Sequence, residues 1–187
     1  PDIRNKLLFS RAIVEAERAL AIWTQLKVDV AKAHVDPAVR EHAEDMEALM
    51  TPIIKSACAD FGTEIANSCL QVFGGHGYIS EWGMEQLVRD VRITQIYEGT
   101  NTIQALDLVG RKLGLHDGRL FDGFMNEVAQ SLQPLEGRND MVEFVVPFKE
   151  ALDRLSATTE WLKEKAHDDP NALGGAANDY LRLFALT

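Results

Sequence analysis

The helical spacing of apolar residues constrains the fold of this chain more than any other feature of its sequence. Between residues 3 and 33, apolar side chains recur every three or four positions, and neither glycine nor proline interrupts them. That spacing places them along one face of a long helix. Asp36 and Pro37 then form a helix start, in which an acidic cap precedes a proline whose fixed φ suits the first turn. A second apolar stripe follows and ends at Gly74 and Gly75.

Proline and glycine predict where these helices stop. Pro52 lacks a backbone donor, so we expect a break or kink near Met50 or Thr51. Four glycines between residues 74 and 83 favour a loop. Beyond this loop we expect helices at residues 84–93 and 101–113, the second with Thr100 as its N-cap.

The composition changes after Gly114, where glycines and prolines separate shorter apolar segments. The pattern predicts a helix near residues 120–132. It then predicts a longer helix that carries a heptad-like apolar seam from Val145 to Ala166. We expect Pro147 to lie in or near the first turn of this longer helix.

The last segment combines Gly174 and Gly175, which predict a stop, with an apolar stretch at residues 180–186. Because this stretch reaches Thr187 without a polar tail, we expect the chain to be truncated within a helix. No segment shows the period-2 alternation of a strand. The sequence therefore predicts an all-α fold, an antiparallel four-helix bundle over residues 1–115 with an additional helical extension over residues 116–187.

The charge and composition exclude several classes of protein. The 19 Lys and Arg against 29 Asp and Glu give a formal net charge of -10, which argues against a nucleic-acid partner. No apolar run approaches the roughly 20 residues of a membrane span. Cys58 and Cys69 lie about 16 Å apart along one expected helix, so they cannot pair, and we expect two buried thiols. Together with the lack of a secretory or transit signal, this favours a reducing compartment, the cytoplasm.

Two segments contain the residues most suited to chemistry, 71–78 (QVFGGHGY) and 89–101 (RDVRITQIYEGTN). The first is on its own an ordinary glycine-capped helix end, although its backbone could approach a ligand closely. Glu98, in the second, precedes a helix N-terminus, where the helix dipole stabilises an anion and where a solvated carboxylate is also common. His76 has no second His or Cys at metal-ligand spacing, so we predict no metal site.

Taken together, the two segments resemble the signature of the acyl-CoA dehydrogenase family of flavoproteins, in which Q-x-x-G-G-x-G-Y/F is followed by R-D and then I-Y-E-G-T. The resemblance covers about residues 1–113. It implies the C-terminal four-helix domain of an FAD-dependent enzyme that dehydrogenates an acyl-CoA thioester. The matching residues are Gln71, Gly74, Gly75, Gly77, Tyr78, Arg89, Asp90, Ile96, Tyr97, Glu98, Gly99 and Thr100.

The resemblance also implies a role for individual residues. Glu98 matches the catalytic base, which removes a proton from the α-carbon while a hydride leaves the β-carbon for the flavin. Thr100 matches a residue that contacts FAD. Gln71, Gly74 and Gly75 match the segment beside the adenosine diphosphate portion of an FAD held mainly by a neighbouring subunit. The implied partners are therefore an acyl-CoA substrate, FAD and further copies of the same chain.

The resemblance further implies that the family's N-terminal helical domain and middle β domain precede this chain. Those domains supply most of the flavin pocket, so we expect this fragment to be inactive by itself. The residues from about 116 onward resemble a subgroup with an extra helical C-terminal region, which includes 3-methylmercaptopropionyl-CoA dehydrogenase-like proteins.

Two other functions remain open from the sequence. The chain could be a non-catalytic interaction or oligomerisation module, in which the seam from Val145 to Ala166 contacts another subunit, whereas a seam packed on the bundle is the simpler alternative. A relative of the acyl-CoA oxidases fits the same motifs. A DNA-associated relative of these flavoproteins is disfavoured by the charge of -10.

Overall fold

The computed structural model describes the backbone of residues 1–187 and all side chains apart from those of His167, Asp168 and Pro170. All regular structure in these residues is helical, which confirms the all-α prediction. The α-helices are α1 (Asp2–Ala33), α2 (Pro37–Val72), α3 (Met84–Arg92), α4 (Asn101–Asp107), α5 (Arg119–Leu132), α6 (Val142–Asp168) and α7 (Pro170–Leu186). The short segments are the 3₁₀ turns η1 (Gly74–Tyr78), η2 (Ser80–Trp82), η3 (Ile93–Gln95), η5 (Leu115–Gly118) and η6 (Gln133–Leu135), and the π-helical turn η4 (Leu108–Lys112).

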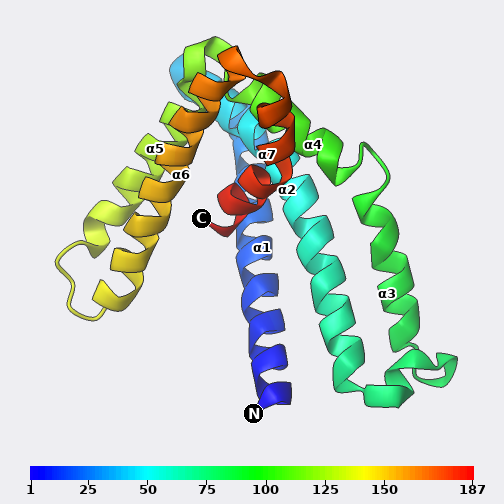
Figure 1. Cartoon of the computed structure of the whole chain (residues 1–187). Helices are drawn as coiled ribbons and strands as arrows, with labels where there is room; N and C mark the ends of the chain where they lie inside the picture. The colour runs from blue at the N-terminus through cyan, green and yellow to red at the C-terminus, as the bar shows by residue number, and fades with distance from the viewer.

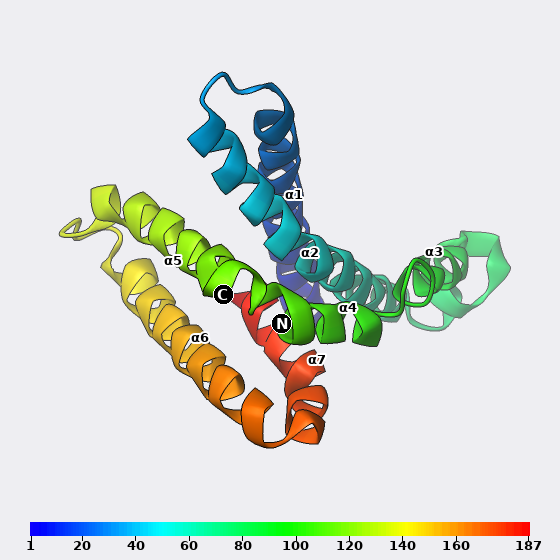
Figure 2. The same ribbon diagram turned by 90° about the horizontal axis from the view of Figure 1, so that it is seen from above.

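Helix α2 is the centre of the arrangement. It packs antiparallel to α1, and α3 returns along its second half, so that α1, α2 and α3 lie side by side (Figure 1). It also contacts α4, α5 and α7. Helices α5 and α6 form a second antiparallel pair that diverges from α1 and α2, and α7 lies between the two groups (Figure 2).

A single hydrophobic core joins the bundle to the extension. Helix α2 contributes Leu49, Met50 and Ile53, and α6 and α7 contribute side chains such as Leu155 and Phe184 to the same cluster. Burial of large apolar side chains of this kind contributes about 1.5–3 kcal/mol each. The extension is therefore part of the fold that holds α2 in place.

The seam of α6 packs inward and is not an exposed surface for another subunit. Leu152, Leu155 and Leu162 are buried, and so is Thr159, whose hydroxyl lies 2.7 Å from the Tyr180 hydroxyl of α7. The alternative in which the seam packs on the rest of the chain is therefore correct for these residues. Ala166, at the end of the predicted seam, is exposed.

Two charged clusters also fasten α5 to the α1–α2 hairpin. The Glu127 carboxylate accepts hydrogen bonds from Lys27 of α1 at 2.5 Å and from His42 of α2 at 2.9 Å. Burial alone would raise the pKa of Glu127, but these two hydrogen bonds outweigh it and the pKa is lowered. Arg119, at the start of α5, donates to both carboxylate oxygens of Asp45 at 2.7 and 3.0 Å.

The break predicted near Pro52 is wrong, because α2 continues through Pro52 as one helix, while a kink there stays a prediction. Pro52 removes one backbone donor, which costs about 3 kcal/mol or more in an isolated helix. Here α2 packs against five other helices, and the residues around Pro52 are buried in the core. Tertiary packing therefore outweighs the local cost.

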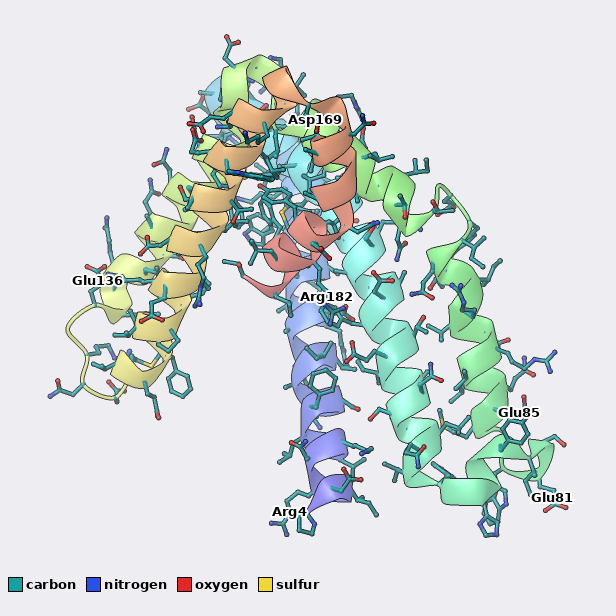
Figure 3. The ribbon with its side chains drawn as sticks, in the orientation of Figure 1. Arg4, Glu81, Glu85, Glu136, Asp169 and Arg182 are labelled. Carbon is teal, nitrogen blue, oxygen red and sulfur yellow. The ribbon has the colours of Figure 1, made fainter. Side chains whose placement is uncertain are left out.

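The predicted stop at Gly174 and Gly175 is also wrong, since α7 runs through both. Each glycine costs a helix about 1 kcal/mol relative to alanine. Asp169 caps the start of the helix, since its side chain accepts a hydrogen bond from the Asn171 backbone N–H at 2.9 Å. A row of buried side chains near the C-terminal end packs the helix into the core. That row comprises Ala177, Tyr180, Leu181 and Phe184. Asp169 is labelled in Figure 3.

Pro147 lies inside α6 near its first turn, as predicted, because α6 begins at Val142. Three other expectations need correction. The loop predicted at residues 74–83 contains η1 and η2, and the helix predicted to reach residue 113 becomes the π-helical η4 after Asp107. The two cysteines are free, as predicted, but only half-buried.

An apolar cavity of about 310 Å³ contains one ionisable group that has no partner. Helices α1, α2, α5, α6 and α7 line it, with side chains such as Leu20, Phe61, Phe124 and Phe184. Glu17 of α1 also lines it, and the buried Oε1 atom of its carboxyl group has no hydrogen-bond partner among the described residues. Burial raises the pKa of Glu17 from 4.5 to about 7.

We predict that Glu17 makes the stability of the chain depend on pH. The unfolded chain releases this proton near pH 4.5 and the folded chain only near pH 7, so the folded state holds the extra proton between these values. The free energy of unfolding should therefore fall as pH rises from about 4.5 to about 7 and then level off. In Glu17→Gln this decline should be absent, when urea unfolding is measured from pH 4 to 8.

The matched control is Glu15→Gln, which changes an exposed carboxylate on the same helix. It should keep the pH dependence of the unmodified chain. Parallel curves for the unmodified chain and for Glu17→Gln would contradict the prediction.

Candidate functional site

The Glu98 turn connects η3 to α4 in a backbone conformation that is rare for a residue with a side chain. Glu98 has φ 55° and Gly99 has φ 80°, so two successive residues are left-handed. A glutamate in this region carries a conformational cost that is typical of functional sites. Thr100 then begins α4 as its N-cap, as predicted, and its hydroxyl accepts from the Ile103 backbone at 3.4 Å.

The Glu98 side chain is exposed and lies at the edge of a hollow of about 250 Å³. The other walls come from α2, from the end of α3 and from the segment between α3 and Glu98, and they combine apolar atoms with one ammonium group. They are Lys55, Cys58, Ala59, Val91, Thr94 and Tyr97. A carboxylate in this position can accept a proton from a ligand that enters the hollow.

Cys58 does not supply a nucleophile to this hollow. Burial and the nearby Glu17 carboxyl raise the pKa of the Cys58 thiol to about 11. At neutral pH the sulfur is therefore almost wholly a protonated thiol, which is a poor nucleophile. Glu98 is the reactive group that this hollow offers.

Side chains of α2 and α4 hold the Glu98 turn in place. Lys55 Nζ donates to the Gly99 carbonyl at 2.7 Å and to Asn101 Oδ1 at 2.8 Å. Asn101 Nδ2 donates to Asp60 at 2.6 Å. Gln104 of α4 holds the preceding peptide group, since its Nε2 donates to the Glu98 carbonyl at 3.1 Å. The turn is thereby fixed to two helices.

The other predicted segment, residues 71–78, forms the glycine turn at the end of α2. Gln71, Gly74 and Gly75 are all exposed, and Gly74 has a left-handed φ of 61°. A Cβ atom added at Gly74 or Gly75 would meet no atom within 4 Å, so the backbone there is open to a ligand. This open, side-chain-free backbone fits the close approach that a pyrophosphate needs.

Gly77 has a different, structural reason to be glycine. A Cβ atom there would lie 2.5 Å from the Leu70 carbonyl oxygen and 2.9 Å from Phe73 Cβ. Gly77 is also the buried residue of the turn. Its role is to let the chain fold back on the end of α2.

The structure does not bring the two predicted segments together. They lie at opposite ends of α3, the glycine turn near the labelled Glu81 and Glu85, and the Glu98 turn at the end that leads into α4 (Figure 3). The nine residues of α3 that lie between them rise roughly 14 Å along the helix axis. Within one copy of the chain they therefore form two separate surfaces.

The sequence reasoning missed Lys55, Asp60, Gln95 and Gln104, which surround the Glu98 turn. Gln95 and Asp60 lie 35 positions apart in the sequence, and Lys55 and Gly99 lie 44 positions apart. Lys55 lies directly beside the apolar residue Ile54 in the stripe of α2, which resembles any solvated position on a helix. A local pattern therefore carries no signal for this network.

Two classes of site have no support among the described residues. No group of three or more His, Cys, Asp or Glu residues is placed to hold a metal ion in that part of the chain. Among the described residues, no helix combines the length and the apolar character that crossing a bilayer requires.

The fold and the Glu98 turn define a helical domain with an exposed carboxylate at the edge of a hollow. Residues 3–114 match the family model described as acyl-CoA dehydrogenase, C-terminal domain. Residues 124–187 match a second model, acetyl-CoA dehydrogenase C-terminal like. The chain belongs to the acyl-CoA dehydrogenase family, which confirms the resemblance found in the sequence.

Individual relatives extend over nearly the whole chain. The 3-methylmercaptopropionyl-CoA dehydrogenase of Ruegeria pomeroyi is 35% identical over 184 residues, which cover 98% of this chain and 31% of the relative. The solved apo form of Bd2924 has a TM-score of 0.72 at 19% identity and covers 97% of this chain and 31% of that one. ACDH-11 of Caenorhabditis elegans, solved with C11-CoA, has a TM-score of 0.68 at 18% identity. The match covers 91% of this chain and 29% of ACDH-11. The chain thus spans less than a third of each of these proteins.

We predict that Gly77→Ala destabilises the chain, because its Cβ would collide with backbone and with Phe73. The loss should be about 1–3 kcal/mol or more in the free energy of unfolding, measured in urea. Gly75→Ala is the matched control in the same turn, and it should change stability little because the space beside Gly75 is open. Equal losses for both variants would refute this account of the turn.

Proposed function

We propose that this chain is the C-terminal part of an FAD-dependent acyl-CoA dehydrogenase in which Glu98 is the catalytic base. The observation that carries the proposal is the left-handed Glu98 turn, held by two helices at the edge of a hollow. Family membership supports the reaction class. The chain has two parts in this proposal, a family bundle over residues 1–115 and a helical extension over residues 116–187.

The chemistry requires two bonds to break in the acyl chain of a thioester. Glu98 accepts the proton from the α-carbon, and the electron pair of that C–H bond becomes part of the new α,β double bond. When bound, FAD supplies the acceptor for the hydride that leaves the β-carbon. The products are an enoyl-CoA, the protonated Glu98 carboxyl group and the reduced cofactor. A carboxylate suits this step because it becomes a stronger base when water is excluded.

The glycine turn would serve the cofactor from a different side. Gln71, Gly74 and Gly75 would contact the adenosine diphosphate portion of an FAD bound mainly by a neighbouring subunit, while Thr100 contacts the cofactor near Glu98. The position of the two surfaces at opposite ends of α3 supports a division of labour across a subunit boundary. The solved complex of ACDH-11 with C11-CoA supports an acyl-CoA as the substrate class.

We predict that Glu98→Gln in the full-length parent enzyme abolishes the chemical step and leaves FAD bound. Glutamine keeps the size of the side chain but cannot accept the proton. The rate of flavin reduction after mixing with acyl-CoA should fall by about 10² to 10⁴-fold, measured by stopped-flow absorbance. Glu81→Gln, an exposed carboxylate beyond the opposite end of α3, is the control and should keep the original rate.

Other outcomes would point to the alternative functions. Flavin reduction at the original rate by Glu98→Gln would remove Glu98 as the base. If the full-length parent binds no flavin, the chain is better described as an interaction module. Rapid reoxidation of the reduced flavin by oxygen would favour an acyl-CoA oxidase.

We predict that this chain associates with itself through α1. Leu8, Ile22 and Leu26 are exposed on this helix, and Ile22 is 69% exposed. Ile22 and Leu26 are one turn apart and so lie on the same face. Size-exclusion chromatography with light scattering should give a mass above that of the monomer, and Ile22→Glu with Leu26→Glu should reduce it. A monomer at high concentration would contradict self-association.

A further inference from the structure

The ammonium group of Lys55 donates two hydrogen bonds near Glu98, and the proposed reaction does not by itself assign it a role. Lys55 lies on α2, and its Nζ reaches the Gly99 carbonyl and the Asn101 side chain. Both acceptors lie within three residues of Glu98. The side chain is half-buried, which makes its two hydrogen bonds less subject to competition from water than those of an exposed lysine.

The Glu98 turn needs such external support because it lacks support of its own. Gly99 adopts a left-handed conformation freely, but Glu98 has a Cβ that makes it unfavourable, and nearby contacts must offset that cost. The carbonyl groups on both sides of Gly99 are held by side chains, that of Glu98 by Gln104 and that of Gly99 by Lys55. The peptide planes that flank Gly99 are therefore fixed in orientation.

The support continues to Asp60, which lies on α2 as Lys55 does. Asp60 Oδ1 accepts from Gln95 at 2.5 Å and from Asn101 at 2.6 Å. Gln95 precedes the Glu98 turn and Asn101 follows it. The two α2 side chains therefore hold the segments on both sides of the turn, and Asn101 links them by bonding to Lys55 and Asp60 at once.

We infer that Lys55 is a positioning residue, which keeps the Glu98 carboxylate in the place that proton transfer requires. The inference rests on the proposed function of Glu98. Lys55 acts through the Gly99 carbonyl and Asn101. Without its ammonium group the turn loses two charge-assisted hydrogen bonds, and Glu98 relaxes towards the right-handed region that a glutamate prefers.

The first test uses the 187-residue chain itself. Lys55→Met should increase the exchange rate of the backbone amides of residues 98–101 by about 10-fold or more, measured by hydrogen–deuterium exchange. Amides of α5 and α6 should keep their rates, which shows that the chain remains folded. Lys32→Met, which replaces an exposed lysine at the end of α1, is the matched control and should change nothing at the turn.

The second test uses the full-length parent enzyme with FAD bound. Lys55→Met should lower the rate of flavin reduction by about 10- to 100-fold, because a displaced catalytic group loses this much. The dissociation constant of the acyl-CoA should stay within about twofold, since the Lys55 ammonium group donates its hydrogen bonds to Gly99 and Asn101. Asn101→Ala removes the acceptor of one Lys55 hydrogen bond, and it should likewise slow flavin reduction without changing the dissociation constant. The variant with both Lys55→Met and Asn101→Ala should reduce flavin no more slowly than the slower of the two single variants.

The outcomes separate this inference from the proposed function. If Glu98→Gln reduces flavin at the original rate, the proposed base is wrong and the role of Lys55 falls with it. If Glu98→Gln is inactive but Lys55→Met and Asn101→Ala keep the original rate, the base is supported and the positioning role is overturned. Unchanged amide exchange at residues 98–101 in Lys55→Met would overturn it as well.

Discussion

The packing of α2 against its neighbours is the interaction on which the rest of the structure depends. This helix passes through the core at Leu49, Met50 and Ile53, and its two ends meet different parts of the chain. One end is joined to α5 by His42 and Asp45, and the far end forms the glycine turn. Because both candidate surfaces are attached to it, any displacement of α2 would move the Glu98 turn and the glycine turn together.

The extension contributes to the site through this same helix. Leu155 of α6 and Phe184 of α7 pack in the same core as Met50 and Ile53 of α2, and Ile53 lies within one turn of Lys55. An apolar core of this density resists displacement of its members. The residues after 116 thus help to keep rigid the surface from which Lys55 reaches the Glu98 turn, although none of them lines the hollow.

The sequence predicted the elements well where a long apolar stripe or a side-chain cap determined them, as along α1 and at Asp36, which begins α2. It failed where tertiary packing decides against local preference, at Pro52, Gly174 and Gly175, since the energy that stabilises those helices comes from residues distant in sequence. The motifs identified Glu98 and the glycine turn as candidates. Their geometry, and the role of Lys55, depend on contacts between segments 44 residues apart, which no local spacing encodes.

The hydrogen bonds around the Glu98 turn and the exposure of its side chain suggest how catalytic work would be divided in a complete enzyme. Within the described residues, the carboxylate is fixed at its backbone and open at its oxygen atoms. A carboxylate gains basicity when water is excluded from it, whereas its placement depends on the backbone that carries it. This chain thus supplies the placement. Exclusion of water, and with it the strength of the base, would come from the surfaces that close over the hollow when cofactor and substrate are bound.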